Sequence, residues 1–472
     1  MSSSGALRAF VLAALVVVFG VGLPQSQSEE GSAQARERPN IVFILTDDLD
    51  ASSTSFMPEL QALMVDQGTT FENAFVTDPL CCPSRATFLR GQYSHNTGIR
   101  SNSPPLGGHE KFRGEGRDRS TVATWLDDAG YYTAYFGKYM NGYEDTKYVP
   151  PGWDRWFGWL GNYYSPGGEY RLNENGSIEA YNRDRIHDTD LLKAKAVHFV
   201  RAQEEGDRPF FAYVATNAPH SPAYVARRHE GMFDGRALPR PPSFDESIVF
   251  DKPGVVRRPR LTPGEAQSLG DLYRRRLASL RSVDDMIGAL IRALKETDQL
   301  HNTYVVFASD NGYLLGQHRL TKKSLPYEES IRIPLIVRGP DVPAQKPEHL
   351  VTNNDFAPTV AQLAGVEPPS FVDGKSFVPL LGAGEKPPLA AWRTGFLVEH
   401  AIPNYQALRT NDHTYVEWSS GEQELYDLEA DPYQLRSVHD APANQALIEK
   451  LSSQLATLRD CKADLCRAAE VR

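Results

Sequence analysis

Residues 40–48 read NIVFILTDD, an apolar run of β-type residues that ends abruptly in a threonine and two aspartates. Residues 303–312 read TYVVFASDNG and repeat this design. Continuous apolar runs of this length are typical of strands that are buried on both faces of a parallel sheet. Two further runs, at Phe210–Ala215 and Ile333–Val337, predict more strands of the same kind.

Helical patterns lie between these runs, at residues 58–67, 121–129, 189–205 and 265–295. Strands that alternate with helices predict an α/β fold, a mostly parallel sheet flanked by helices. After about Pro388 the pattern changes to short alternating runs and one final helix, which predicts a smaller C-terminal domain with an antiparallel sheet. We therefore predict a large α/β domain at residues 36–387 and a smaller α+β domain at residues 388–472.

The composition is that of an ordinary globular protein. The 472 residues are 41% hydrophobic and 23% charged, which excludes disordered and fibrous classes and suits one large or two unequal domains. With 60 acidic and 50 basic side chains, the net charge is −10. Nucleic acids and anionic lipids are bound through a basic excess, so we expect neither as a partner. An anionic ligand would need a local positive field.

The N-terminus has the layout of a signal peptide. Arg8 precedes the apolar run Ala9–Leu23, which is shorter than a membrane span requires, and Ala33-Gln-Ala35 offers a cleavage site. We predict a signal peptide at residues 1–35 and a mature protein that is secreted or periplasmic, with no membrane span. The alternative is an uncleaved membrane anchor.

The four cysteines form two pairs in the sequence. Cys461 and Cys466 are close together, and in an oxidising compartment we expect a small-loop disulfide between them. Cys81 and Cys82 are adjacent, a spacing that disfavours a bond between them. An unbridged pair of thiols in an exported protein calls for another explanation.

Polar side chains follow two of the predicted strands at the points where they end. Asp47-Asp48 and Asp310-Asn311 would meet at one edge of a parallel sheet, where open α/β proteins bind their ligands. Three carboxylates and an amide suit a hard divalent cation, Ca²⁺ or Mg²⁺. The alternative is that each pair only caps or turns the chain.

Residues 81–91 read CCPSRATFLRG. This segment resembles the signature of the sulfatase family, Cys-x-Pro-Ser-Arg followed by a leucine and a glycine at this spacing. The resemblance implies that Cys81 is oxidised after translation to formylglycine (3-oxoalanine), with a formylglycine-generating enzyme as the maturation partner. It also implies an alkaline-phosphatase-like fold and a bound Ca²⁺, with Mg²⁺ the weaker choice.

The resemblance extends along most of the chain. The matching segments are Thr46–Asp48, Gly137–Asn141, Ala218–Pro222, Ser309–Gly312 and Lys323–Glu328. The doubled cysteine and the run Tyr93–Asn96 are similar to the branch of N-acetylglucosamine-6-sulfatases and heparan 6-sulfatases. Many sulfatases have a histidine two residues after the lysine of Gly-Lys, where this chain has Met140. His95 is our candidate for its replacement.

The resemblance also implies roles for individual residues. It assigns metal binding to Asp47, Asp48, Cys81, Asp310 and Asn311, catalysis to Cys81, Arg85, Lys138, His220 and Lys323, and substrate binding to His95 and His318. A hydrated aldehyde at position 81 has two hydroxyls, so one can attack sulfur while proton loss from the other later releases sulfate. Lys138 and Lys323 would bind sulfate oxygens, and His220 would protonate the leaving alcohol.

We therefore predict a sulfuric ester hydrolase that cleaves sulfate monoesters, either 6-O-sulfates of N-acetylglucosamine-type sugars, as in glycosaminoglycans, or aryl sulfates. One alternative is a phosphonate monoester or phosphodiester hydrolase with the same nucleophile. The other is a non-catalytic protein that binds sulfated glycans and keeps Cys81 unconverted.

Arginine runs at residues 227–228, 257–260 and 274–276 could recognise a polyanionic glycan. The last run falls in a predicted helix, where consecutive residues cannot share one face, so we predict that it is a solvated surface. The Arg- and Pro-rich residues 239–263 are predicted to form a long surface loop.

Overall fold

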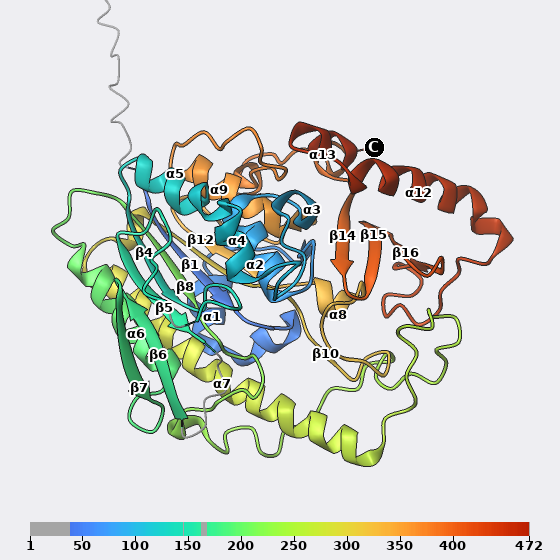
Figure 1. The fold of residues 1–472 in the computed structure, drawn as a ribbon, viewed down its shortest axis with the longest axis horizontal. Coiled ribbons are helices and arrows are strands. Elements are labelled where there is room, and N and C mark those ends of the chain that lie inside the picture. Colours follow the sequence, from blue (N-terminus) through green and yellow to red (C-terminus); the bar gives the residue numbers. More distant parts are fainter. Residues whose placement is uncertain (1–37, 145, 162–167, 472) are drawn as a thin grey trace, which may run out of the picture. The chain divides into compact units, whose positions relative to one another are not determined.

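The computed structural model describes residues 38–144, 146–161 and 168–471. In this part of the chain, nine strands form a central sheet in the order β2-β12-β9-β1-β8-β4-β5-β6-β7 (Figure 1). From one edge to the other, the strands are β2 (Thr69–Thr70), β12 (Leu335–Arg338), β9 (Thr303–Ser309), β1 (Asn40–Thr46), β8 (Phe210–Ala215), β4 (Tyr132–Gly137), β5 (Arg155–Leu160), β6 (Glu169–Glu174) and β7 (Ser177–Asn182).

The five central strands, from β9 to β5, are parallel, and the outer strands are antiparallel. All four predicted apolar runs contribute to this sheet, but the run Ile333–Val337 was expected to be parallel and instead forms β12, antiparallel to β9. A parallel return needs a crossover, usually a helix that carries the chain back to the start of the neighbouring strand. Here the chain between β9 and β12 forms only the hairpin of β10 (Leu314–Leu315) and β11 (Thr321–Lys322) and the short helix α8 (Glu328–Ile331).

Helices cover both faces of the sheet because alternate residues of β1 point to opposite sides. Ile41, Phe43 and Leu45 pack with α2 (Cys81–Arg90), α5 (Val122–Asp128) and α9 (Phe356–Leu363). Val42 and Ile44 pack with α1 (Pro58–Leu60), α6 (Asp188–Ala202) and α7 (Pro263–Glu296) on the other face. The predicted helix at residues 58–67 is divided, since α1 continues as a π-helical segment at Gln61–Val65. Short helices complete this part: α3 (Ser94–Thr97), α4 (Gly108–Gly114), α10 (Val378–Leu381) and α11 (Leu389–Trp392).

The C-terminal part contains the predicted small antiparallel sheet. Its strands follow one another in order as β14 (Gly395–Ala401), β15 (Asn404–Thr410), β16 (His413–Trp418) and β17 (Gln423–Asp427). The last of these was not predicted, because it carries only two apolar side chains in a row. One face of the sheet packs on the β10–β11 region, and the other packs on α12 (Gln445–Arg459) and α13 (Asp464–Ala469). The predicted fold class is therefore confirmed, whereas the division between residues 387 and 388 stays a prediction.

The N-terminal predictions concern residues that lie largely outside the described part of the chain. The predicted signal peptide at residues 1–35 is in that segment. Among the helices of the described residues, none combines the length and the apolar character of a bilayer span. The structure joins Cys461 and Cys466 in a disulfide and leaves Cys81 and Cys82 as free thiols.

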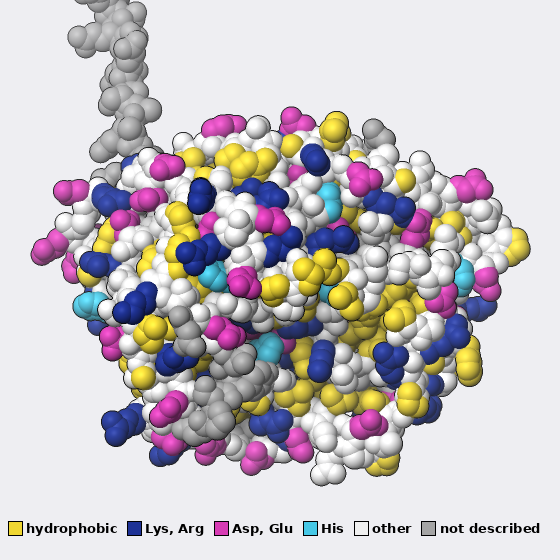
Figure 2. Space-filling view, viewed as in Figure 1, with side chains coloured by type: hydrophobic (Ala, Val, Ile, Leu, Met, Phe, Trp, Pro, Cys, Tyr) yellow, Lys and Arg dark blue, Asp and Glu magenta, His cyan; other side chains and the backbone are white. Residues whose placement is uncertain are grey.

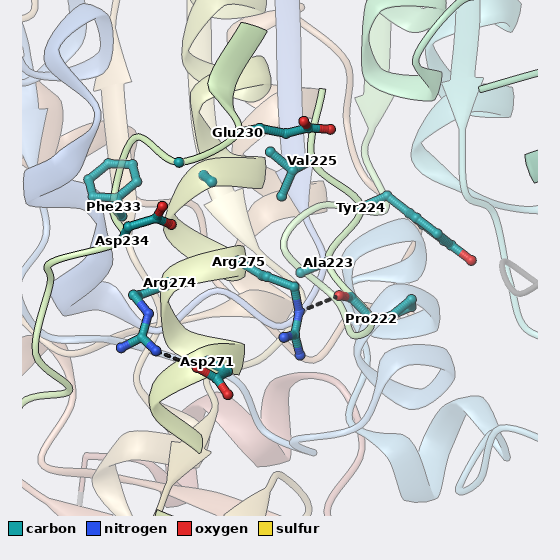
Figure 3. Close-up of a pocket in the computed structure, with 12 residues that line it drawn as sticks. Pro222, Ala223, Tyr224, Val225, Glu230, Phe233, Asp234, Asp271, Arg274 and Arg275 are labelled. Atoms are coloured by element: carbon teal, nitrogen blue, oxygen red, sulfur yellow. Dashed lines mark hydrogen bonds and ion pairs between the residues drawn. The ribbon is translucent and has the colours of Figure 1, made fainter. Parts of the chain in front are cut away.

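The structure bears on two predictions about arginine-rich segments, and the second of them needs correction. Residues 239–263 form a loop, but Glu246 and Lys252 are buried in it and form an ion pair at 3.1 Å, so this loop is attached to the body of the protein. In the run 274–276, Arg274 pairs with Asp271 on the surface of α7, beside a cavity of about 580 Å³ (Figure 3). Arg276, two residues on, is 1% exposed and is not part of a solvated surface. Over the face shown in Figure 2, acidic and basic side chains are interspersed.

Candidate active site

The two predicted acidic strand ends lie side by side. β1 and β9 are parallel neighbours, and their pairing places Thr46 opposite Ser309, so the following residues share one edge of the sheet. The backbone amide of Asp48 donates to Asp310 Oδ1 at 3.0 Å, and Asn311 Nδ2 donates to Asp48 Oδ1 at 2.7 Å. With Asp47, these side chains are buried. The geometry gathers three carboxylates and one amide into a single cluster.

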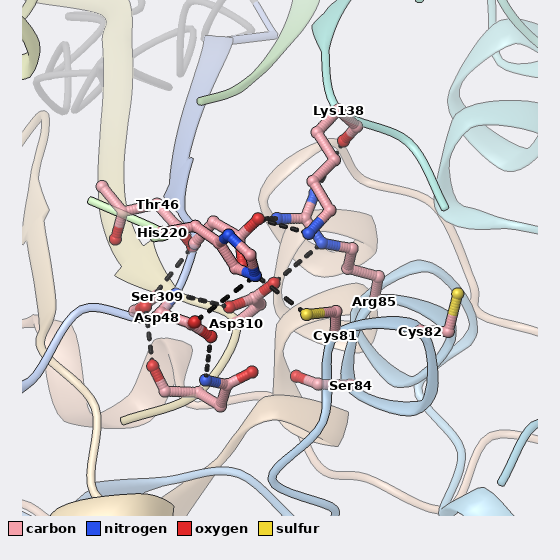
Figure 4. A network of polar contacts seen from close by, with 12 residues as sticks. Thr46, Asp48, Cys81, Cys82, Ser84, Arg85, Lys138, His220, Ser309 and Asp310 are labelled. Carbon is pink, nitrogen blue, oxygen red and sulfur yellow. Dashed lines mark hydrogen bonds and ion pairs between the residues drawn. The ribbon is translucent and has the colours of Figure 1, made fainter. Parts of the chain in front are cut away.

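Cys81 is the first residue of α2, and it faces this cluster (Figure 4). Its Sγ lies 3.6 Å from Asp47 Oδ1 and 3.0 Å from Lys323 Nζ. Pro83 lies in the first turn, where a missing N–H costs nothing, so the helix can begin at Cys81. Cys82 points to the other side of α2, where its Sγ accepts a hydrogen bond from the Asn141 amide at 3.1 Å. Position 81, and not position 82, is therefore presented to the acidic edge.

Three basic side chains surround the carboxylates. Lys138, directly after β4, pairs with Asp47, and Lys323, directly after β11, pairs with Asp48. Arg85 lies one turn into α2, and its Nε contacts Asp310 Oδ2 at 2.9 Å while its Nη1 donates to the Lys138 carbonyl at 2.6 Å. Each carboxylate thus has a cationic neighbour, and the positive field that an anionic ligand needs is local.

The pKa values of these groups reflect burial opposed by charge. Burial alone would raise the pKa of Asp47 and Asp48. The positive charge of Lys138 beside Asp47, and that of Lys323 beside Asp48, outweigh burial and hold both pKa values below their usual range. Burial and the nearby charge of Asp47 raise the pKa of Asp310. Burial also raises the pKa of the Cys81 thiol to about 11, despite the nearby lysines. An unmodified Cys81 is therefore a neutral thiol at neutral pH, not a thiolate.

Two buried polar atoms in the cluster are without a hydrogen-bond partner among the described residues: Asn311 Oδ1 and Arg85 Nη2. The first is an acceptor beside carboxylates, where a hard cation would satisfy it, and the donor set is the oxygen-rich one that Ca²⁺ and Mg²⁺ prefer. One ligand atom from each of Asp47, Asp48, Cys81 and His220 also lies within 4.8 Å of the others. The second atom, 3.8 Å from Asp47 Oδ2, suits an anionic oxygen near residue 81. The residues present therefore fit both a divalent cation and an anionic group.

His220 lies at the entrance of the cluster, on the turn that follows β8. Its Nδ1 donates to the Ser221 carbonyl at 2.7 Å, and its Nε2 lies 3.6 Å from Asp48 Oδ2. Because a carbonyl only accepts, this contact puts a proton on Nδ1 and directs Nε2 toward the carboxylates. The ring borders a cavity of about 120 Å³ that Asp47 and Lys138 also line.

Among the further residues that line this cavity, Glu144, Trp159 and Asn217 were not singled out in the sequence. Asn217 is 5% exposed, and its Nδ2 has no hydrogen-bond partner among the described residues. The sequence could have indicated a site role for Asn217, since it follows the end of a predicted strand and precedes His220 by three residues. Trp159, on β5, offered no such signal, because nothing in the sequence shows which strand lies next to β4.

The structure does not bring the two predicted substrate-binding histidines to the cluster. His95 Nδ1 contacts Glu399 Oε1 at 2.8 Å and its Nε2 donates to the Cys461 carbonyl at 3.0 Å, beside the C-terminal disulfide. His318 is buried, with its Nδ1 3.2 Å from Glu246 Oε2. Both rings are thus held by glutamates of other segments, so His95 does not take the place of the histidine that Met140 replaces.

The known proteins that resemble this chain include sulfatases. The family model described as "Sulfatase" matches residues 39–366, which include the whole cluster, and the model described as "N-sulphoglucosamine sulphohydrolase, C-terminal" matches residues 316–461. Human N-acetylglucosamine-6-sulfatase is 31% identical over 525 aligned residues, covering 100% of this chain and 91% of the human protein. The putative extracellular sulfatase Sulf-1 homolog of Caenorhabditis elegans is 36% identical, over 78% of this chain. This chain spans 54% of that relative, about half of its length.

Solved structures give the same result. A solved complex of another protein with its substrate, D-glucosamine-2-N,6-O-disulfate, superposes with a TM-score of 0.74 at 25% identity, covering 89% of this chain and 97% of the other. The predicted alkaline-phosphatase-like fold and the predicted family are both confirmed. The chain belongs to the sulfatase family.

Proposed function

We propose that this protein hydrolyses sulfate monoesters of sugars, with a 6-O-sulfate of an N-acetylglucosamine-type residue as the first substrate to test. The observation that carries the proposal is the position of Cys81, at the start of a helix and within 3.6 Å of Asp47 and 3.0 Å of Lys323. A human relative carries the name N-acetylglucosamine-6-sulfatase, and a structural neighbour was solved with a glucosamine that bears a 6-O-sulfate. Aryl sulfates are the convenient test substrates of the same class.

The proposed nucleophile is residue 81 after oxidation by a formylglycine-generating enzyme. As formylglycine, this residue would supply a hydrated aldehyde with two hydroxyls. One would attack sulfur, and proton loss from the other would re-form the carbonyl and release sulfate, a step that a single thiol could not provide. Asp47, Asp48, Asp310 and Asn311 would hold a divalent cation beside it, Ca²⁺ in the first instance, which would supply a Lewis acid. Asn311 Oδ1, buried without a protein partner among the described residues, is the acceptor that supports this assignment.

The chain's own cationic groups would bind the sulfate. Lys138 and Lys323 lie on two sides of Asp47 and Asp48, and their ammonium groups would bind the anionic oxygens of the ester. Arg85 is anchored on Asp310 through Nε, and its Nη2 would donate to an oxygen at position 81. Fixed charges in a buried site stabilise developing negative charge more than the same charges in water do.

His220 is the proposed proton donor to the leaving alcohol. The Ser221 carbonyl fixes the ring through Nδ1, so Nε2 is the atom that faces the cavity where the sugar oxygen would lie. A sugar alkoxide is a poor leaving group, so proton transfer in the transition state is worth a large factor in rate. The amide of Asn217, in the same cavity, would donate to an oxygen of the substrate.

Export to an oxidising compartment is part of the proposal. It is supported by the apolar run Ala9–Leu23 near the N-terminus, by the Cys461–Cys466 disulfide, and by the name of the extracellular Caenorhabditis elegans relative. The secreted and the periplasmic locations are both compatible with these observations.

The proposal is tested by coexpressing the protein with a formylglycine-generating enzyme and assaying a panel of substrates. The panel contains N-acetylglucosamine 6-sulfate, sulfated disaccharides, 4-nitrophenyl sulfate, a phosphonate monoester and a phosphodiester. We expect turnover of the sulfates, loss of activity in Cys81→Ala, and retained activity in the matched control Cys82→Ala. Mass spectrometry of the tryptic peptide 37–85 should show replacement of the Cys81 CH₂SH group by an aldehyde.

Three outcomes would contradict the proposal. Faster hydrolysis of the phosphorus esters would favour the phosphonate or phosphodiester hydrolase. An intact thiol at Cys81 in active protein would exclude the formylglycine mechanism. Binding of sulfated glycans by converted protein that hydrolyses none of the sulfates would favour the non-catalytic alternative.

A further inference from the structure

Arg276 is a buried arginine in the middle of α7, and none of the proposed chemistry uses it. Its two neighbours lie at the surface: Arg274 pairs with Asp271, and the exposed Arg275 donates from Nε to the Pro222 carbonyl at 3.4 Å (Figure 3). Arg276 itself is 1% exposed. A buried guanidinium needs several partners to offset its lost hydration, so its contacts show what holds it there.

The contacts of Arg276 connect three segments of the active site. Its Nη1 donates to the carbonyl of Pro219, the residue before His220, at 3.2 Å. Its Nη2 donates to the carbonyl of Asp48 and lies 3.4 Å from Asp50 Oδ1. The guanidinium carbon lies 4.1 Å from the centre of the ring of Tyr313, two residues after Asn311. One side chain thus contacts the segments that follow β1, β8 and β9.

The contact with Asp48 is made at a strained position. Asp48 has a φ of +66°, a left-handed conformation that non-glycine residues adopt at a cost in energy. This conformation accompanies the contacts of the Asp48 carboxylate with Asn311 and Lys323. A hydrogen bond from Arg276 to the Asp48 carbonyl stabilises the strained backbone, since a buried carbonyl without a donor would be costly.

We infer that Arg276 is a positioning residue for the reaction: by binding the carbonyls of Asp48 and Pro219 together, it holds His220 at the carboxylate cluster. This inference rests on the proposed role of His220 as proton donor. The planar guanidinium can donate to two carbonyls in fixed directions at once, which a lysine ammonium on a flexible stem cannot do with the same geometry. Arg276 touches no group that the substrate would contact.

The inference predicts a selective loss of rate. In Arg276→Lys and Arg276→Met, kcat for a sugar 6-sulfate should fall by about 100-fold, the typical effect of misplacing a catalytic group by about 1 Å. The kcat for 4-nitrophenyl sulfate should fall far less, because nitrophenolate leaves without a proton. KM for both substrates should be almost unchanged. A merely structural role would reduce both rates together, through the fraction of folded protein.

The comparison includes His220→Ala and the double variant Arg276→Met/His220→Ala. If Arg276 acts through His220, then Arg276→Met causes almost no further loss in the His220→Ala background, because the group that it positions is absent. The matched control is Arg274→Met on the same helix, which should behave as wild type. Thermal unfolding and the formylglycine content at position 81 are measured for every variant. If Arg276→Met does not fold, Arg276→Lys, which keeps the positive charge, serves in its place.

Equal losses on both substrates, no loss, or additive losses in the double variant would overturn the inference. If His220→Ala itself shows no selective loss on the sugar sulfate, His220 is not the proton donor, and the inference fails with that role. Sulfate hydrolysis that depends on Cys81 would still stand in that case, so the two failures are distinguishable.

Discussion

Asn217 is the cavity residue whose polarity is simplest to change. Its amide nitrogen is buried beside His220 and has no hydrogen-bond partner among the described residues. A buried donor of this kind is costly unless a ligand accepts from it, so we expect it to donate to a substrate oxygen. Its position three residues before His220 means that both side chains are presented by the same turn, since the His220 amide donates to the Asn217 carbonyl at 2.9 Å.

We predict that Asn217→Asp weakens substrate binding, because a carboxylate of nearly the same shape replaces a donor with a negative charge. KM for an anionic sulfate ester should rise at least tenfold, about 1.4 kcal/mol or more, in steady-state assays. Asn217→Ala, which removes the donor without adding charge, should raise KM less. If the two variants behave alike, or if neither changes KM, the amide does not face the substrate.

His95 and Glu399 form an ion pair that depends on pH. Burial disfavours the charged ring, but the carboxylate of Glu399 outweighs burial and raises the pKa of His95 to about 9. A folded-state pKa above the unfolded value means that the pair stabilises the fold below about pH 6.5, and that this stabilisation is lost as the pH rises through about 9.

We predict that Glu399→Gln lowers the free energy of unfolding by on the order of 2 kcal/mol near pH 6, and that the difference shrinks toward zero near pH 10. Glutamine keeps an oxygen that can accept from His95 but removes the charge. Urea denaturation at the two pH values measures the effect. The exposed His301→Gln should show no such dependence, and a Glu399→Gln deficit that is constant with pH would contradict the assignment.

At the level of elements, the long helix α7 connects the surface to the active site. Thr262 and Glu265 form a capping box at its start, with Pro263 in the first turn. Further along, Leu280, Val283 and Ile287 pack on the central sheet. Arg276 lies between these two regions of the helix. There its side chain reaches the carbonyls of Asp48 and of Pro219, the residue before His220.

We predict that Thr262→Ala lowers the free energy of unfolding by about 1 kcal/mol, because it removes the side-chain acceptor of the Glu265 amide. Catalytic constants should not change, since the packed part of α7 lies beyond the cap. Chemical denaturation combined with kinetics on 4-nitrophenyl sulfate tests both statements. Ser268→Ala, an exposed position inside the same helix, is the control and should have little effect. A loss of kcat in Thr262→Ala would show that the cap and the active site are coupled.

At the level of the whole molecule, a net charge of −10 coexists with a site built to bind an anion. The positive charge that an anion needs is local. Arg85 on α2, Lys138 at the end of β4 and Lys323 at the end of β11 surround the carboxylate cluster. A bound divalent cation would add positive charge at the same point and would satisfy Asn311 Oδ1.

We predict that removal of divalent cations lowers the melting temperature and that added Ca²⁺ restores it. A ligand that binds only the folded state at about 100 times its Kd contributes about 2.7 kcal/mol. Scanning calorimetry of chelator-treated protein, titrated separately with Ca²⁺ and Mg²⁺, measures the shift and the preference between the two ions. Asn311→Leu should reduce the shift. A melting temperature that responds to neither ion would exclude a metal at this cluster.

Several features were predictable because they depend on short stretches of chain. The apolar strands, the polar residues that end β1 and β9, the Cys-x-Pro-Ser-Arg segment and the C-terminal antiparallel sheet each carry a local pattern. The direction of β12 was not predictable in this way, because it depends on whether the preceding 25 or so residues cross the sheet or stay at one edge. The positions of His95 and His318 depend on glutamates that are far away in the sequence, Glu399 and Glu246.

The amino-acid sequence by itself determined the family, the α/β alternation and the residue types of the cluster, because hydrophobic period, strand ends and a contiguous motif are properties of neighbouring residues. Only the tertiary structure decided which of the many histidines and arginines reach the cluster. His220 lies there and His95 does not, and Arg276 points inward while Arg274 points outward. The physical reason is that a long-range contact depends on how helices and loops pack against one another, and no single segment of the chain encodes that packing.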